Sequence, residues 1–73
     1  MDTMERVAVR SRDIAIIGYD PSSLTLEIAF RSGGVYHYFG VPEEIHKNLV
    51  VAASQGKYFE ESIKYKFRYQ KIS

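Results

Sequence analysis

The 73-residue sequence contains no cysteine, so neither a disulfide nor a thiolate metal site can stabilise the fold. No apolar run approaches the roughly 20 residues that a membrane-spanning helix needs. Residues 1–6 lack the apolar stretch of a secretory signal. We therefore expect a soluble, cytoplasmic protein. Because internal repeats, linkers and low-complexity tracts are also lacking, residues 1–73 are predicted to form one domain.

Motifs of enzymes and metal sites are scarce. No serine lies in a G-x-S-x-G motif, and residues 32–34 lack the spacing of a phosphate-binding loop. His37 and His46 are the only histidines. Glu43 and His46, spaced i, i+3 on a predicted helix, supply two metal ligands where a zinc site needs three or four. We expect no catalytic activity, no metal and no cofactor.

The first half of the chain alternates between apolar and polar residues. Residues 1–10 predict either a loosely ordered arm or an edge strand, and residues 13–19, rich in isoleucine, predict a strand in the middle of a sheet. Asp20 and Pro21 begin a turn. Residues 24–30 then show the cleanest period of two in the chain, which predicts a half-buried strand whose even-numbered residues point inward.

A serine and two glycines close the following hairpin, and the length of this turn decides where two tyrosines point. A three-residue loop with Gly34 in the left-handed conformation pairs Phe30 with Tyr36. It also pairs Ile28 with Tyr38, which places both tyrosines on the core face. A two-residue turn shifts the register by one and sends both tyrosines to the opposite face. The glycines permit either turn, and we favour the three-residue loop.

Helical patterns follow. Pro42 is predicted in the first turn of a helix whose apolar face extends to residues 52–53. Ser54 is a candidate cap for a second short helix, with Gly56 marking the break between the two. Residues 65–72 alternate again and predict a last strand. These elements predict an α+β domain, a small antiparallel meander sheet with two short helices packed on one face and a C-terminal strand.

Several short motifs occur in an order that resembles one family. They are Ile17-Gly18-Tyr19-Asp20, Leu26, Phe30, Tyr36-His37-Tyr38, Val41-Pro42, Leu49, Ser54, Gly56-Lys57-Tyr58-Phe59 and Ile63. Over residues 11–72 the chain resembles the KTSC domain, found as small single-domain bacterial proteins and at the C-terminus of some lysyl-tRNA synthetases. Glu60 stands where the family commonly has asparagine, and Phe67 replaces a usual tyrosine. The resemblance implies no catalytic activity, and the attachment to a tRNA enzyme suggests RNA binding.

Positive charge is concentrated at the C-terminal end. Residues 1–56 carry five Lys or Arg against seven acids, a net charge of −2, whereas residues 57–73 carry five against two, a net charge of +3. Such asymmetry marks either a contact surface or a solvated edge kept soluble by lysines. A last strand would project Lys66 and Arg68 together, near Lys64 and Lys71, where they could neutralise a few phosphates.

Two hypotheses about function follow. The first is a non-catalytic accessory module that binds RNA, with tRNA as the candidate, through this basic surface; tyrosines spaced i, i+2 could also stack bases if the sheet face were open. The candidate residues are Lys64, Lys66, Arg68, Lys71, Tyr36 and Tyr38. The alternative is a protein-interaction or structural module that acts through an exposed strand edge or a tyrosine-rich surface. Neither hypothesis involves a membrane, and the sequence does not fix the oligomeric state.

Overall fold

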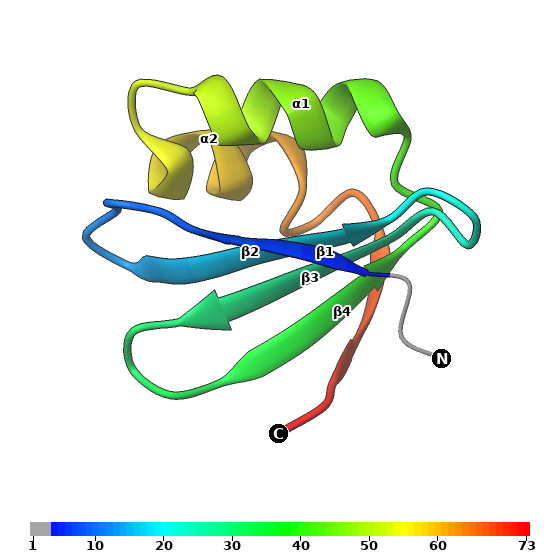
Figure 1. The fold of residues 1–73 in the computed structure, drawn as a ribbon, viewed down its shortest axis with the longest axis horizontal. Coiled ribbons are helices and arrows are strands. Elements are labelled where there is room, and N and C mark those ends of the chain that lie inside the picture. The colour runs from blue at the N-terminus through cyan, green and yellow to red at the C-terminus, as the bar shows by residue number, and fades with distance from the viewer. Residues whose placement is uncertain (1–3) are drawn as a thin grey trace.

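Five antiparallel strands and two helices make up the fold in this computed structural model, which describes residues 4–73 (Figure 1). The strands follow one another in the sheet in chain order. No helix within residues 4–73 is both long and apolar enough to cross a membrane. The elements are β1 (Glu5–Ala8), β2 (Ile14–Asp20), β3 (Thr25–Phe30), β4 (Val35–Phe39), α1 (Glu43–Val51), α2 (Gln55–Ser62) and β5 (Arg68–Lys71).

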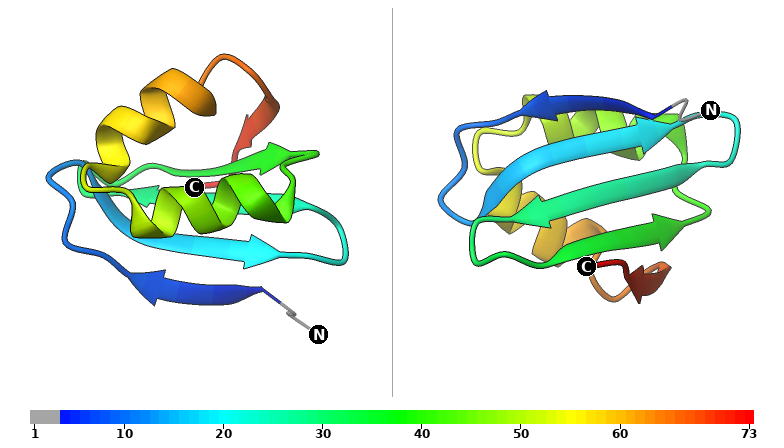
Figure 2. Two further views of the ribbon diagram at one scale, coloured as in Figure 1. Left: turned by 90° about the horizontal axis from the view of Figure 1, so that it is seen from above. Right: turned by 60° about the horizontal axis from the view of Figure 1, so that its bottom comes forward.

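Both helices lie on one face of the sheet, and the opposite face carries no helix from the described part of the chain (Figure 2). The predicted α+β architecture is therefore confirmed. The core between the layers is aliphatic at its centre, since Ile17, Leu26 and Ile28 from the sheet are completely buried, as are Leu49 from α1 and Ile63 after α2. The inward side chains of the strands, which recur every two residues, thus meet the apolar stripe of each helix, which follows the helical period of 3.6 residues.

The hairpin between β3 and β4 places its tyrosines on the helix face, as the favoured loop predicts, but in a different register. Ile28 pairs with Tyr36 and Leu26 with Tyr38, two residues away from the predicted pairing. The three-residue loop spans residues 31–33, and Gly33 rather than Gly34 has the positive φ, at 115°. A shift of two residues keeps every side chain on its face.

Arg31 explains why this loop starts one residue earlier than predicted. Its backbone N–H donates to the Asp13 carbonyl oxygen at 2.9 Å, outside the hairpin. Its guanidinium donates to the carbonyl oxygens of Ser11 and Val9, at 2.7 and 2.8 Å. Arg31 therefore joins the hairpin to the β1–β2 connection instead of extending the pairing with β4. Sequence alternation cannot reveal such a long-range partner.

Three element boundaries also differ from the prediction. The last strand begins at Arg68 and not at Tyr65, because residues 63–67 form a turn in which the Lys66 N–H donates to the Ile63 carbonyl oxygen at 3.0 Å. Ser54 does cap α2, accepting from the Lys57 N–H, but Gly56 lies inside that helix. Helix α1 ends at Val51, before the two alanines. Within the N-terminal segment, Glu5–Ala8 is an edge strand.

Tyr19 joins the sheet to α1. Its hydroxyl donates to the carbonyl oxygen of Val41 at 2.6 Å in a buried position, and its ring stacks on His46 with the ring centres 4.4 Å apart. Burial, reinforced by the nearby Glu43 and Asp20 carboxylates, raises the pKa of Tyr19, and burial lowers the pKa of His46. Both rings are thus held in their neutral forms at neutral pH.

We predict that Tyr19→Phe lowers the free energy of unfolding by about 1–3 kcal/mol, because it removes the donor from a buried carbonyl oxygen and leaves the ring in place. Urea denaturation of both proteins at neutral pH measures the change. Tyr69→Phe is the matched control, because Tyr69 is 61% exposed, and it should change the free energy by less than about 0.5 kcal/mol. Equal effects of the two substitutions would contradict a structural role for the Tyr19 hydroxyl.

Candidate functional site

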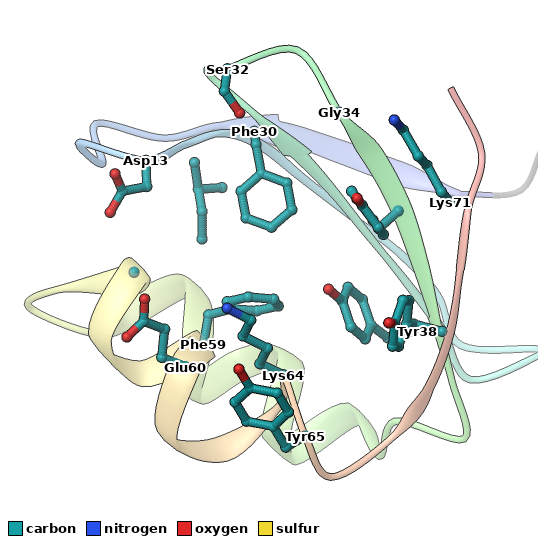
Figure 3. A pocket seen from close by; sticks show the side chains of 14 residues that line it. Asp13, Phe30, Ser32, Gly34, Tyr38, Phe59, Glu60, Lys64, Tyr65 and Lys71 are labelled. Atoms are coloured by element: carbon teal, nitrogen blue, oxygen red, sulfur yellow. The ribbon is translucent and has the colours of Figure 1, made fainter.

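A cavity of about 540 Å³ lies between α2 and the strands β4 and β5 (Figure 3). Four of the six residues predicted to bind nucleic acid line it: Tyr36, Tyr38, Lys64 and Lys71. Two further tyrosines, Tyr65 and Tyr69, lie in its wall and are 84% and 61% exposed. We call this feature the tyrosine cavity. It brings side chains from the centre and the C-terminal end of the sequence into one site.

Aromatic rings form one continuous surface in this cavity. The centre of the Tyr36 ring lies 6.5 Å from that of Tyr38, and the Tyr69 ring lies 6.0 and 5.7 Å from the two. Phe30 and Phe59 extend this surface, each in edge-to-face contact with a tyrosine. These contacts lie within the range of favourable aromatic pairs. Tyr38 is buried, while Tyr36 and Tyr69 expose progressively more of their rings to the cavity and solvent.

Strand pairing explains the arrangement of the tyrosines. Tyr69 of β5 pairs with Tyr38 of β4, and Lys71 pairs with Tyr36. Directly paired residues of antiparallel strands point to the same face. Tyr69 and Lys71 therefore join the two β4 tyrosines on the helix side of the sheet. The predicted alternation of the last strand holds from Arg68 onward, although the strand is shorter than predicted.

The four predicted cations separate into two pairs. Lys64 and Lys71 line the tyrosine cavity. Lys66 and Arg68 line a second, shallower hollow with Phe39. The reason is that Arg68 pairs with Phe39 and so points to the face opposite Lys71, while Lys64 and Lys66 belong to the turn before the strand. The basic residues thus flank β5 on both sides instead of forming one row.

The cavity also contains carboxylates that the nucleic-acid hypothesis did not include. Asp13, directly before β2, and Glu60, on α2, both line it. Gly56 lies beside Asp13, and a Cβ atom at this glycine would come within 3.1 Å of the Asp13 Oδ2 atom. The missing side chain at Gly56 therefore leaves room for the Asp13 carboxylate. No local sequence pattern indicates this, because Asp13 and Gly56 are 43 positions apart in the chain.

The hydroxyls in the cavity influence one another. Burial raises the pKa of Tyr38 to about 12, and the neighbouring Tyr36 and Tyr69 contribute to the increase. A tyrosinate at this position would be poorly solvated and close to two other phenols. At neutral pH Tyr38 therefore offers a neutral phenol group, which can donate and accept hydrogen bonds.

The helix-free face of the sheet carries a different set of residues. His37 and Phe39 are the aromatic pair that points to this face, with ring centres 6.4 Å apart, because Tyr36 and Tyr38 point to the other one. His37 is joined to Glu27 at 2.9 Å, and Arg6 reaches Glu27 over Gly18 with a contact of 2.6 Å. A Cβ atom at Gly18 would lie 3.0 Å from the Arg6 side chain.

The Glu27 carboxylate is therefore largely buried although its face of the sheet carries no helix from residues 4–73. Its hydrogen bond with Arg6 lowers its pKa, with a smaller contribution from His37, against the opposing effect of burial. The contact with this carboxylate fixes the orientation of the His37 ring. Within residues 4–73 no group of three His, Cys, Asp or Glu side chains is placed to hold a metal ion.

Comparison with known proteins identifies the family. The KTSC domain model matches residues 10–67. A crystal structure of a KTSC domain protein from Yersinia pestis superposes with a TM-score of 0.93 at 48% sequence identity, over 96% of this chain and 99% of that one. The chain belongs to the KTSC domain family. The resemblance noted in the sequence is thereby confirmed.

Two further relatives show the contexts in which this KTSC domain sequence recurs. A protein of Stutzerimonas stutzeri is 40% identical over 70 residues, which cover 94% of this chain and 99% of that protein. A lysine–tRNA ligase of Nostoc is 42% identical over 55 residues, which cover 75% of this chain and 10% of the ligase. The KTSC domain is thus similar both to a whole small protein and to a minor part of a much larger enzyme.

We predict that the KTSC domain loses stability as the pH rises from about 10 to about 12, in part through Tyr38. The pKa of Tyr38 is higher in the folded protein, at about 12, than its ordinary value of 10.0. This difference stabilises the folded state below pH 10, and the stabilisation is lost as the pH rises from 10 to about 12. Tyr38→Phe should reduce the slope of unfolding free energy against pH in this window, as measured by urea denaturation. An unchanged slope would contradict the buried position of the phenol.

A second prediction concerns acid. Because the pKa of Glu27 is lowered, its contribution to stability is present above the ordinary value of 4.5 and is lost as the pH falls through the folded value. Glu27→Gln should lower the unfolding free energy by about 1 kcal/mol at pH 7 and flatten the loss of stability below about pH 4.5. The exposed Glu44→Gln is the control. Parallel acid curves for the wild type and Glu27→Gln would refute the ion pair.

Proposed function

We propose that this KTSC domain is a non-catalytic accessory module that binds RNA, with tRNA as the first candidate, through the tyrosine cavity and strand β5. One observation carries the proposal: the cavity gathers Lys64 and Lys71 beside the exposed rings of Tyr65 and Tyr69. Cations beside exposed rings are the combination that single-stranded nucleic acid requires, since phosphates need counter-charge and unpaired bases need a flat apolar surface.

Exposed tyrosine rings contribute affinity without contributing much to the core. Tyr65 is 84% exposed, and the Lys64 Nζ atom lies 5.3 Å from the centre of its ring. A base stacked on such a ring would add about 1–3 kcal/mol. The Lys64 ammonium group lies over one face of the Tyr65 ring, so a base would stack on the other face and leave the ammonium group close to the adjoining phosphate. The ring and the cation therefore suit one nucleotide together.

The division of the cations around β5 supports a path for the rest of the RNA strand. Lys66 and Arg68 line the hollow on the far side of this edge strand. An RNA strand that enters the tyrosine cavity between Lys64 and Lys71 would continue across the edge toward this second pair. Each neutralised phosphate releases counterions, so the affinity should fall as the salt concentration rises.

The relatives favour tRNA over other RNAs. Lysine–tRNA ligases of Nostoc and Trichormus variabilis contain a segment that is 42% and 44% identical to this chain. In both cases the segment amounts to 10% of the ligase, so the activity of those enzymes does not transfer to this chain. A segment of that size in an enzyme named for tRNA would be suited to holding the RNA rather than to the reaction.

A protein-interaction function is the second candidate, and the two edge strands favour it. Every residue of β1 and of β5 is exposed, and each of these strands has one side without a partner strand within residues 4–73. Exposed edges can accept an extended peptide as an additional strand. The cavity, by contrast, is not needed for strand addition, so substitutions in the cavity separate the two candidates.

We predict that the wild type binds labelled tRNA and that Lys64→Gln with Lys71→Gln weakens the binding by about tenfold at 50 mM salt. The slope of log K against log salt should also become shallower, by roughly 0.7–0.9 for each phosphate that the variant no longer neutralises. Fluorescence anisotropy at 50 and 200 mM salt measures both quantities. Circular dichroism of the double variant verifies that it is folded.

Lys47→Gln with Lys57→Gln is the charge-matched control, because both lysines are exposed and lie outside the tyrosine cavity. This control should retain binding within about twofold, since it changes the net charge by the same amount. Equal losses in the two double variants would reduce the effect to net charge and reject the cavity as the interface. Binding of the wild type that is absent or independent of salt would reject RNA binding itself.

A further inference from the structure

The tyrosine cavity has opposite charges at its two ends. In Figure 3, Asp13 and Glu60 lie at one end, Lys71 and Tyr38 lie at the other, and Lys64 points into the middle of the cavity beside Phe59. The Phe30 and Phe59 rings lie between them in edge-to-face contact, with centres 5.5 Å apart. A ligand that fills this cavity therefore needs a hydrogen-bond donor at one end, a flat apolar middle and an anion at the other end.

The charged groups of the cavity are not used by the fold. Within residues 4–73, neither the Asp13 nor the Glu60 carboxylate forms an ion pair or accepts a hydrogen bond. Lys64 and Lys71 likewise have no carboxylate partner among these residues. These carboxylates and ammonium groups face one cavity without pairing with each other. They therefore remain available to bind a ligand.

The acidic end discriminates between the groups that a base can present. An ionised carboxylate only accepts hydrogen bonds. It therefore accepts a hydrogen bond from the exocyclic amino group of adenine, cytosine or guanine. Uracil has no amino group and offers only its ring N3–H, which lies between two carbonyl oxygens that a carboxylate repels. A carboxylate also repels phosphate, which leaves the phosphate to Lys71 at the other end (Figure 3). The charges thus fix the direction in which a nucleotide would enter.

The size of the cavity agrees with this ligand. Sites for small molecules measure about 300–1,000 Å³, and the tyrosine cavity measures about 540 Å³. This volume lies in the range expected for a ligand the size of one nucleotide. Gly56 keeps the acidic end open, because a Cβ atom at this position would come within 3.1 Å of the Asp13 carboxylate.

We propose that the tyrosine cavity holds one unpaired nucleotide whose base carries an exocyclic amino group, with the amino group at Asp13 and Glu60 and the phosphate at Lys71. The proposal rests on the proposed function in that it names the part of the RNA that enters the cavity. It adds a preference for adenine, cytosine or guanine over uracil, which binding through β5 alone does not require.

The test compares free mononucleotides. AMP, CMP, GMP and UMP are titrated separately into the full chain, up to about 10 mM, a range that reveals millimolar dissociation constants. Chemical shifts of the backbone amides, measured by NMR, report both affinity and location. At least one amino-bearing nucleotide should bind about tenfold or more tightly than UMP, a difference of about 1.4 kcal/mol. The largest shifts should fall on residues that line the cavity.

Asp13→Asn with Glu60→Gln tests the acidic end. The amides can donate as well as accept, so the preference over UMP should fall to within about twofold, a remaining difference of about 0.4 kcal/mol. Glu44→Gln with Glu61→Gln is the matched control, because both acids are exposed on the helices and lie outside the cavity. It should keep the full preference. The readout is a ratio of affinities, which a general change in charge or stability does not alter.

The possible outcomes separate this inference from the function on which it rests. UMP binding as tightly as the other three, shifts outside the cavity, or no saturation by any nucleotide would each overturn the inference. RNA binding through the lysines would stand in these cases if the tRNA titration succeeds. Selective binding of the amino-bearing nucleotides together with failed tRNA binding would retain the cavity as a nucleotide site and reject the RNA module.

Discussion

The register between β3 and β4 is the constraint on which the rest of this structure depends. Pairing Leu26 with Tyr38 and Ile28 with Tyr36 sends both tyrosines to the side of the helices and His37 to the other side. A slip of one residue would exchange these faces. The tyrosines would then leave the cavity, and His37 would lie away from Glu27, which it now bonds. One hairpin therefore determines both the cavity and the ion pair on the opposite face.

The two faces of the sheet use their charges differently. On the helix-free face, Arg6 and His37 compensate the largely buried carboxylate of Glu27, so that the charge is tolerated away from water. In the tyrosine cavity, two acids and two lysines remain exposed and unpaired within residues 4–73. Exposed charges contribute little to stability whether or not they pair. The fold therefore explains the position of Glu27 but does not explain why opposite charges line one cavity.

Local patterns predicted most of the elements but not the positions that depend on distant partners. The period of two over residues 24–30 correctly placed Leu26 and Ile28 in the core. The capping role of Ser54 was also predictable, because it involves a residue only three positions away. The hairpin register was wrong by two residues because Arg31 bonds to residues about 20 positions earlier. The early start predicted for β5 failed because alternation alone cannot distinguish a strand from the turn at residues 63–67.

Local patterns also predicted part of the candidate site, but not the residues that distant segments bring to it. Tyr36 and Tyr38 were found by their spacing, and Lys64 and Lys71 by the charge of the C-terminal segment; all four line the cavity. Asp13 and Glu60 were missed because they belong to different elements and meet only through the packing of α2 near the start of β2. That packing places an acidic end opposite Lys71 (Figure 3). A surface that binds nucleic acid only through positive charge would not need such an end. A site with a cation at one end and carboxylates at the other is better suited to a single oriented nucleotide than to an unspecific polyanion.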